Sequence, residues 1–205
     1  MLERVQSFFG SPIIHSQGWG ICNGLADGID SFAIKEGENY YFTNVVGVVG
    51  CGLSESSFRS LPKQSVFNIE NIITNNGLVI SEMPPLKKQD TFSVIKSCRI
   101  QAGLGFGLIL IQSSTTGGSR FTIKAAVESN KPIGVVYPIK MDIERDDYGA
   151  NKKIIENGIR GLNECIELKN NNNFNSQIFT LKTKELYPEF EAIVEGKEKV
   201  FVLNS

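Results

Sequence analysis

The sequence predicts an α/β fold, in which helices cover both faces of a parallel β-sheet. Apolar runs of strand length recur up to about residue 138, and segments with a helical spacing of apolar residues lie between them. Glycine, proline or small polar residues close most of these runs, as expected where strands end in turns. Such alternation is typical of a parallel sheet with right-handed crossovers. With 205 residues, of which 41% are hydrophobic, the chain is long enough to bury one sizeable core.

Each predicted strand is a continuous run rich in Val, Ile and Leu, the pattern of strands buried on both faces. The runs occupy residues 19–25, 44–52, 77–83, 107–112 and 131–138. Gly50 and Gly52 close the second run, and Pro84 and Pro85 follow the third. We therefore expect a turn after each strand, at the edge where a parallel sheet meets its ligands.

The predicted helices lie between these runs. Residues 61–77 begin near Pro62, place Val66, Ile69 and Ile73 on one face and end at Gly77. Further segments with helical character are residues 26–37, 96–103 and 121–130.

The pattern weakens after residue 139. Residues 144–162 predict a loop and a short amphipathic helix, and the polar tract 169–177 predicts a surface loop. Residues 191–204 resemble two short strands around Glu195-Gly196-Lys197, so we expect a C-terminal β-hairpin.

Charge and cysteine usage exclude several classes of protein. The net charge is −1 and the pI is about 5.9, so any basic surface must be local. The cysteines are far apart and form no CxxC pair, and His15 is the only histidine, which argues against a metal site and a disulfide scaffold. The sequence shows no signal peptide and no run approaching the roughly 20 apolar residues of a membrane span. We therefore expect a cytoplasmic protein without metal or cofactor.

The turns after the predicted strands hold the candidate binding residues. Gly24, Gly28 and Asp30 follow the first run, and Gly52 closes the second. The segment "SSTTGGSRFT" (113–122) follows the fourth run and opens a helix.

The segment 113–122 is suited to phosphate or another oxyanion. Gly117 and Gly118 let an anion approach the backbone, Ser119 and Thr122 add hydroxyl donors, and the start of a helix carries unpaired N–H groups and a partial positive charge. The alternative is an ordinary N-cap formed by Ser or Thr, which spacing alone favours about equally.

Two charged residues lie near these turns. Glu82 stands at a strand end, where a carboxylate can act as a base, bind ribose or cap a neighbouring helix. Arg99 can hold a phosphate with a bidentate fork, although a lone arginine is about as often solvated. No nucleophile, base and orienting residue stand together, so we predict no catalytic residue and no enzyme. The glycines of "GLGFG" (103–107) precede a strand, so they predict a helix C-cap turn and not a dinucleotide-binding motif.

Several segments resemble motifs of the DNA-processing protein A (DprA/Smf) family. "ICNGLADGIDSFAIKEG" (21–37) resembles "SGLARGID…AH", "VVGVVGCGLS" (45–54) resembles "AVLGCGLD", and "NNGLVISEMPP" (75–85) resembles "GLLLSEFPP". Residues 99–136 resemble the stretch from "RIIAGLS" through "SGSL.TA", and "GANKKIIENG" (149–158) resembles "GCN.LI..GA". The motifs keep the family's order over about residues 19–160.

The resemblance implies an extended Rossmann-like fold of the SLOG class over residues 1–165, with an extension of loop and hairpin over 166–205. It also implies a homodimer that binds single-stranded DNA in a basic pocket and delivers the strand to a recombinase during transformation or repair. Arg99 takes the place of the second arginine in the family's "RNR". The resemblance puts the anion-binding turn on Gly117, Gly118, Ser119 and Thr122, and the "GLA.GID" turn on Gly24, Gly28 and Asp30.

The chain departs from the family at several positions. Ser97 and Cys98 stand where the family has the first arginine and the asparagine of "RNR", and Lys96 and Arg120 are candidate substitutes. Asp27 replaces a basic residue in the "GLARGID" turn, where it repels phosphate. Residues 1–18 predict a helix in place of the family's opening strand with its "VGSR/GTR" loop, and no winged-helix tail is evident.

Two alternatives therefore stay open beside DNA binding. One is a sensor or carrier of a nucleotide or another phosphate ligand on the same fold. The other resembles the LOG phosphoribohydrolases, which cleave a nucleotide N-glycosidic bond and need a glutamate beside the glycine-rich turn. Glu128 lies too far along the predicted helix for that role, so we rank this alternative last.

Overall fold

The computed structural model describes residues 19–35, 42–168 and 175–203. The helix predicted for residues 1–18 lies outside these residues, as does most of the polar tract 169–177. The chain divides into two compact units, Met1–Leu104 and Gly105–Ser205, each with its own parallel sheet. All five predicted runs contain a strand, so the predicted α/β parallel class is confirmed.

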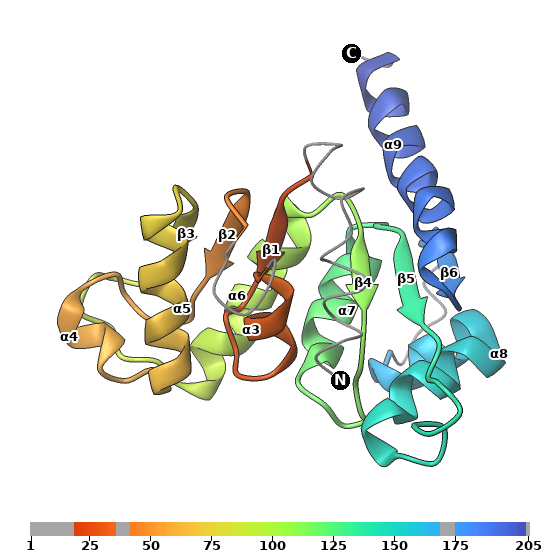
Figure 1. Cartoon of the computed structure of the whole chain (residues 1–205), viewed down its shortest axis with the longest axis horizontal. Coiled ribbons are helices and arrows are strands. Elements are labelled where there is room, and N and C mark those ends of the chain that lie inside the picture. The colour runs from red at the N-terminus through yellow and green to blue at the C-terminus, as the bar shows by residue number, and fades with distance from the viewer. Residues whose placement is uncertain (1–18, 36–41, 169–174, 204–205) are drawn as a thin grey trace. The chain divides into compact units, whose positions relative to one another are not determined.

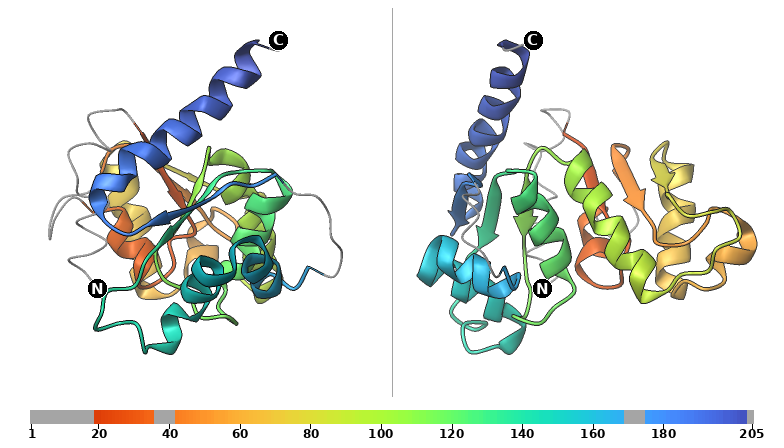
Figure 2. Two further views of the ribbon diagram at one scale, coloured as in Figure 1. Left: turned by 90° about the vertical axis from the view of Figure 1, so that its right-hand side faces the viewer. Right: turned by 180° about the vertical axis from the view of Figure 1, so that it is seen from behind.

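The first unit is built on three parallel strands in the order β1-β2-β3. The strands are β1 (Ile21–Asn23), β2 (Val45–Val48) and β3 (Leu78–Ile80). Helices α3 (Ile29–Ala33) and α5 (Lys63–Thr74) lie over one face, and α6 (Thr91–Leu104) lies over the other (Figures 1 and 2). A short helix, α4 (Glu55–Phe58), follows the turn after β2. Helices therefore cover both faces of this sheet, as predicted.

The core of the first unit lies between β2 and α5. Val45 and Val49 pack there with Ile69 and Ile72 of α5 and with Leu25 of the turn after β1. Ile73, which the sequence pattern placed on the inner face of this helix, is 57% exposed. The buried residues of α5 are Ser65, Asn68, Ile69 and Ile72, an i, i+3, i+4, i+7 stripe, and Ile73 lies beside this stripe on its solvent side.

The N-terminus of α6 is fixed by a reciprocal pair of side-chain bonds. The Ser93 N–H donates to the Asp90 carboxylate at 2.8 Å, and the Asp90 N–H donates to the Ser93 hydroxyl at 3.0 Å. This is the capping-box arrangement, which satisfies two helix-end donors at once. The Lys87 ammonium, together with the Ser93 N–H, lowers the pKa of Asp90 to about 2. The helix start is therefore well defined, which matters because α6 carries Lys96 and Arg99.

The second unit holds the parallel strands β4-β5-β6. They are β4 (Leu108–Leu110), β5 (Ile133–Val136) and β6 (Ile178–Leu181). Its helices are α7 (Ser119–Glu128), α8 (Gly149–Cys165) and α9 (Tyr187–Leu203), with short 3-10 turns η1 (Asp146–Tyr148) and η2 (Lys184–Leu186). Helix α8 ends at the predicted domain limit, residue 165, and β6 beyond it pairs with β5. The division of the chain at that limit stays a prediction.

Helices cover both faces of this second sheet as well. Ile133 and Val135 of β5 pack with Ile123 of α7 and Ile154 of α8 in one core. Gly134, between them, faces the opposite side, because successive residues of a strand alternate. A Cβ on Gly134 would lie 3.3 Å from the Phe190 ring of α9. Helix α9 therefore packs on the face opposite α7 and α8.

The predicted C-terminal β-hairpin is wrong, because residues 187–203 form helix α9. Phe190 and Val194 are one helical turn apart and are both buried. They pack over Gly107 and Gly134, where a Cβ would come within 3.3 Å of Phe190. The missing side chains at these glycines leave room for a helix against the sheet. The strand that pairs with β5 beyond β4 is β6.

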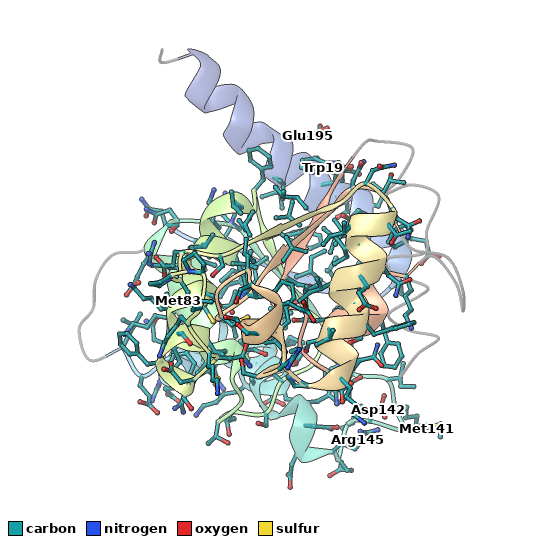
Figure 3. The ribbon with its side chains drawn as sticks, turned by 90° about the vertical axis from the view of Figure 1, so that its left-hand side faces the viewer. Trp19, Met83, Met141, Asp142, Arg145 and Glu195 are labelled. Atoms are coloured by element: carbon teal, nitrogen blue, oxygen red, sulfur yellow. The ribbon has the colours of Figure 1, made fainter. Side chains whose placement is uncertain are left out.

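The connection between β5 and α8 is held by ion pairs. The Arg145 guanidinium contacts Asp142 at 3.3 Å and also pairs with Asp147 (Asp142 and Arg145 are labelled in Figure 3). The Lys152 ammonium donates to the Ile143 carbonyl at 2.6 Å. This connection therefore has a defined path onto the start of α8. Among the described residues, no helix is both long enough and apolar enough to cross a bilayer.

Candidate nucleic-acid interface

Asp30 folds the turn that follows β1. One of its carboxylate oxygens accepts hydrogen bonds from the N–H groups of Gly24 and Ala26, both at 3.1 Å. Burial raises the pKa of Asp30, and these two hydrogen bonds oppose the rise. The residue as a whole is partly exposed, but its carboxylate is enclosed by the turn. Asp30 thus organises the turn from within, a role that the sequence alone did not separate from ligand binding.

Gly28 supplies the conformation that the turn needs. Its φ of 90° lies in the region that side-chain-bearing residues rarely adopt. Its N–H donates to the carboxylate of the exposed Asp27 at 2.9 Å. An anion at this turn would meet both the negative charge of Asp27 and an N–H group that already has an acceptor. That Asp27 disfavours phosphate at the Gly24–Asp30 turn stays a prediction.

Gly52 is packed against the proline turn that follows β3. It is buried, and its N–H donates to the Lys87 carbonyl at 2.8 Å. A Cβ at this position would overlap the carbonyl oxygens of Pro84 and Pro85. The structure thus gives Gly52 a packing role, and phosphate binding by this residue stays a prediction.

Helix α6 presents a basic and aromatic face to solvent. Phe92, Lys96 and Arg99 are spaced i, i+4 and i+7, so they lie along one side of the helix. Phe92 is 73% exposed, and the side chains of Lys96 and Arg99 are 44% and 59% exposed. Sequence reasoning found the two cations but missed Phe92, although an aromatic residue one turn before a lysine is a readable signal. We call Phe92, Lys96 and Arg99 the α6 face.

Glu82 pairs with both cations of the α6 face. One carboxylate oxygen binds the Arg99 guanidinium, and the other lies 4.0 Å from the Lys96 ammonium. The α6 face is therefore partly neutralised by one carboxylate. The roles expected for Glu82 as a base, a ribose ligand or a helix cap stay predictions.

The glycine-rich turn of the second unit opens helix α7. Gly118 is the N-cap residue, and in the described part of the chain no side chain hydrogen-bonds to this helix end. The alternative of an ordinary N-cap formed by Ser or Thr is therefore wrong for this helix end, and Ser119 is the first helical residue. The Gly117 N–H donates to the Ser114 carbonyl at 3.1 Å, which curls the chain back before the helix. The N–H groups of Arg120 and Phe121 donate to the carbonyls of Gly117 and Gly118, both at 3.2 Å, so the start of α7 is held by backbone bonds and has no side-chain cap.

Asn151 anchors the strand ends beneath this turn. It is fully buried, and its amide nitrogen lies 3.0–3.2 Å from the carbonyl oxygens of Leu110, Ile111 and Val136. Its amide oxygen accepts the Ser113 N–H at 3.0 Å. One side chain of α8 therefore ties the ends of β4 and β5 to the first residue of the 113–122 segment. Sequence reasoning placed Asn151 within a motif but assigned it no role, because nothing local reveals partners that lie 15 to 41 positions away.

Arg120 lies beside the turn in a shallow pocket. Its guanidinium contacts Glu167 at 3.4 Å and stacks 4.9 Å from the centre of the Phe121 ring. Lys124 and Ile166 complete the lining. Arg120 is thus present as a candidate substitute for the missing arginine, but it is paired with a carboxylate, as Arg99 is. Thr122 is the fourth residue of α7 and is partly buried.

The structure places the predicted residues in two groups. Gly24, Gly28, Asp30, Gly52, Lys96 and Arg99 belong to the first unit, and Gly117, Gly118, Ser119, Arg120 and Thr122 belong to the second. That both groups line one crevice stays a prediction. No cluster of three or more potential metal ligands occurs among residues 19–35, 42–168 and 175–203.

Comparison with known proteins gives consistent matches. The family model described as "DNA recombination-mediator protein A" matches residues 6–170. The DNA processing protein DprA of Bacillus subtilis strain 168 is 24% identical over 146 residues, which are 71% of this chain and 46% of that protein. The chain therefore spans about half the length of this curated relative.

Two solved structures have a similar fold. One, from Helicobacter pylori, gives a TM-score of 0.68 at 17% identity and covers 95% of this chain and 74% of that chain. It was described for the single-stranded DNA binding mode of DNA processing protein A. The other, DprA from Streptococcus pneumoniae, gives a TM-score of 0.56 at 20% identity and covers 92% of this chain and 56% of that chain.

Proposed function

The chain belongs to the DNA recombination-mediator protein A family, and from this premise we propose that it binds single-stranded DNA without catalysing a reaction. In this proposal the cations of the α6 face hold backbone phosphates, and Phe92 stacks on a base. The amides and hydroxyls at the start of α7 hold a further phosphate. The observation that carries the proposal is the exposure of one aromatic and two basic side chains along one side of α6.

This combination fits a single strand better than a duplex. A base of a single strand can leave its neighbours and stack on an aromatic ring, which contributes about 1–3 kcal/mol per base. Lysine and arginine hold the adjacent phosphates and release counterions. The net charge of −1 is compatible with this, because a local pair of exposed cations, Lys96 and Arg99, is enough to hold phosphates at this face. The H. pylori relative, whose binding of single-stranded DNA has been described, supports the same reading.

The experiment is a salt series of oligothymidylate binding, followed by fluorescence anisotropy. We expect affinity to fall steeply as salt rises, and Arg99→Ala to weaken binding about tenfold and to flatten the salt slope by about 0.7, the value for one phosphate contact. Arg59→Ala is the matched control, because Arg59 is an exposed arginine of the same unit that pairs with Glu55 at 3.5 Å. Equal losses in the two variants, or affinity independent of salt, would contradict the proposal.

The uncapped start of α7 favours a second candidate function, the binding of a nucleotide phosphate. Backbone donors at a helix start bind a phosphate group readily, and Gly118 leaves this end open. Thermal stabilisation by mononucleotides, without stabilisation by oligonucleotides, would support a sensor or carrier. The hydrolase alternative gains no support, because Glu128 is the last residue of α7, about 14 Å of helix away from Ser119.

We extend the proposal to the assembly and its partner. A cytoplasmic homodimer that passes bound DNA to a recombinase follows from family membership and not from a contact in this chain. Sedimentation equilibrium tests the dimer. Transfer is tested with single-stranded DNA that another binding protein already covers. The wild type should accelerate recombinase loading on this DNA more than the Arg99→Ala variant does.

A further inference from the structure

Glu82 lies between the end of β3 and the proline pair Pro84-Pro85, directly beside the α6 face. Its two carboxylate oxygens are divided between the two cations, one on the Arg99 guanidinium and one 4.0 Å from the Lys96 ammonium. Its side chain is 22% exposed, less than those of Lys96 (44%) and Arg99 (59%). The carboxylate therefore lies on the inner side of the two cations, while their outer sides remain open to solvent.

The backbone around Glu82 is held in place. The Ser81 hydroxyl donates to the Cys51 carbonyl at 2.6 Å and accepts the Met83 N–H at 3.0 Å (Met83 is labelled in Figure 3). The first bond ties Ser81 to the turn that follows β2, and the second ties Met83 to Ser81, so the residues on both sides of Glu82 are held. The carboxylate is thus presented to α6 from an anchored segment, and its position does not depend on a long flexible loop.

We infer that Glu82 is an internal competitor of the DNA phosphate and sets the affinity of the α6 face. This inference rests on the proposed function. A carboxylate and a phosphate use the same guanidinium donors, so a strand must displace Glu82 or share the cations with it. Displacement breaks the contacts of Glu82 with the cations, and sharing leaves the phosphate close to a like charge, so both lower affinity.

The competitor matters most for ligands that have few other contacts. A mononucleotide has a single phosphate group with which to overcome the Glu82 contacts. An oligonucleotide adds contacts elsewhere, so the same penalty is a smaller share of its binding free energy. Glu82 therefore lowers the affinity for both ligands by at least a similar factor, so a single phosphate is held only weakly while a polyanionic strand, with its further contacts, is still bound.

The test compares Glu82→Gln with Glu55→Gln in oligothymidylate and mononucleotide binding. Glu55 is the matched control, because it is an exposed glutamate of the same unit in an ion pair with an arginine, and both changes remove one negative charge. We expect Glu82→Gln to tighten oligothymidylate binding about three- to tenfold and Glu55→Gln by less than about twofold. The gain for a mononucleotide should be at least as large. In a Lys96→Ala, Arg99→Ala background the Glu82→Gln gain should disappear.

Three outcomes overturn the inference alone: equal gains in the two single variants, a gain that survives loss of both cations, or weaker binding by Glu82→Gln. In each of these cases the loss caused by Arg99→Ala can still uphold the proposed function. If neither the wild type nor Glu82→Gln binds the oligonucleotide, both the function and the inference fail. A thermal melt of each variant confirms folding, and Glu82→Ala provides a second variant for which the same gain is expected.

Discussion

Replacing Asn151 with alanine tests how the 113–122 segment is held. The side chain is fully buried and has four hydrogen-bond contacts, three through its amide nitrogen and one through its oxygen. The nitrogen carries two hydrogens, so at most two of its three contacts are strong at one time. Two donated bonds and one accepted bond, at about 1 kcal/mol each, give a loss of about 3 kcal/mol in the free energy of unfolding. A chain of this size should then melt about 6–12 °C lower.

The assays separate a local from a global effect. Far-ultraviolet circular dichroism in a urea series measures the unfolding free energy, and hydrogen exchange measures protection of the Ser113 N–H, which donates to Asn151. Asn157→Ala is the control, because Asn157 lies on the same helix and is exposed, and its one side-chain bond goes to Lys153 at 3.3 Å. We expect that control to lose less than about 0.5 kcal/mol.

The Asn151→Asp variant gives a second reading of the same site. Its carboxylate can still accept the Ser113 N–H but would face the three carbonyl oxygens without a donor. We expect it to be less stable than Asn151→Ala at neutral pH and to recover as the pH falls and the carboxyl is protonated. The reasoning is refuted if Asn151→Ala loses less than about 1 kcal/mol, or if exchange at Ser113 does not change.

Three further predictions concern the first unit. Asp30→Asn should keep the turn, because both N–H bonds reach one oxygen, whereas Asp30→Ala should lose about 1–3 kcal/mol in the free energy of unfolding. Burial raises the pKa of Asp30 above 3.8 in the folded chain, so the wild type should lose stability as the pH rises through this raised pKa. Melts across pH should show this loss in the wild type and not in Asp30→Asn. In a urea titration, Gly52→Ala should lower the free energy of unfolding by about 1–3 kcal/mol or more. Gly103→Ala, where a Cβ meets nothing within 4 Å, should not lower it by this amount. Phe92→Ala should weaken oligothymidylate binding by about 1–3 kcal/mol with an unchanged salt slope; a changed slope would mean that the ring does not act by stacking.

The strands were predictable because their signal is local. Val45 to Val49 and Ile133 to Val136 are unbroken apolar runs, and these runs alone predict buried parallel strands. The C-terminal helix was not predictable in the same way. Its β-branched residues favour a strand by propensity, but Phe190 and Val194 pack on a sheet whose glycines lie far away in sequence. Tertiary contact decided this segment against its local preference.

The candidate residues were predictable by type more than by role. Arg99 and the Gly117–Thr122 turn were identified because cations and helix starts suit phosphate. The inward role of Asp30, the packing of Gly52 and the pairing of Glu82 with Arg99 depend on which residues the fold brings together. Pairings of this kind leave no spacing pattern in the sequence, because each partner lies on a separate element.

The most direct test of phosphate recognition by this protein is a methylphosphonate scan of a short oligothymidylate. Each variant oligonucleotide has one uncharged linkage, and its affinity is measured for the wild type and for Arg99→Ala. The account predicts that the wild type loses affinity at particular linkages, and that at least one of these losses disappears in Arg99→Ala. An identical profile of losses in the two proteins would contradict the account, because Arg99 would then hold no phosphate.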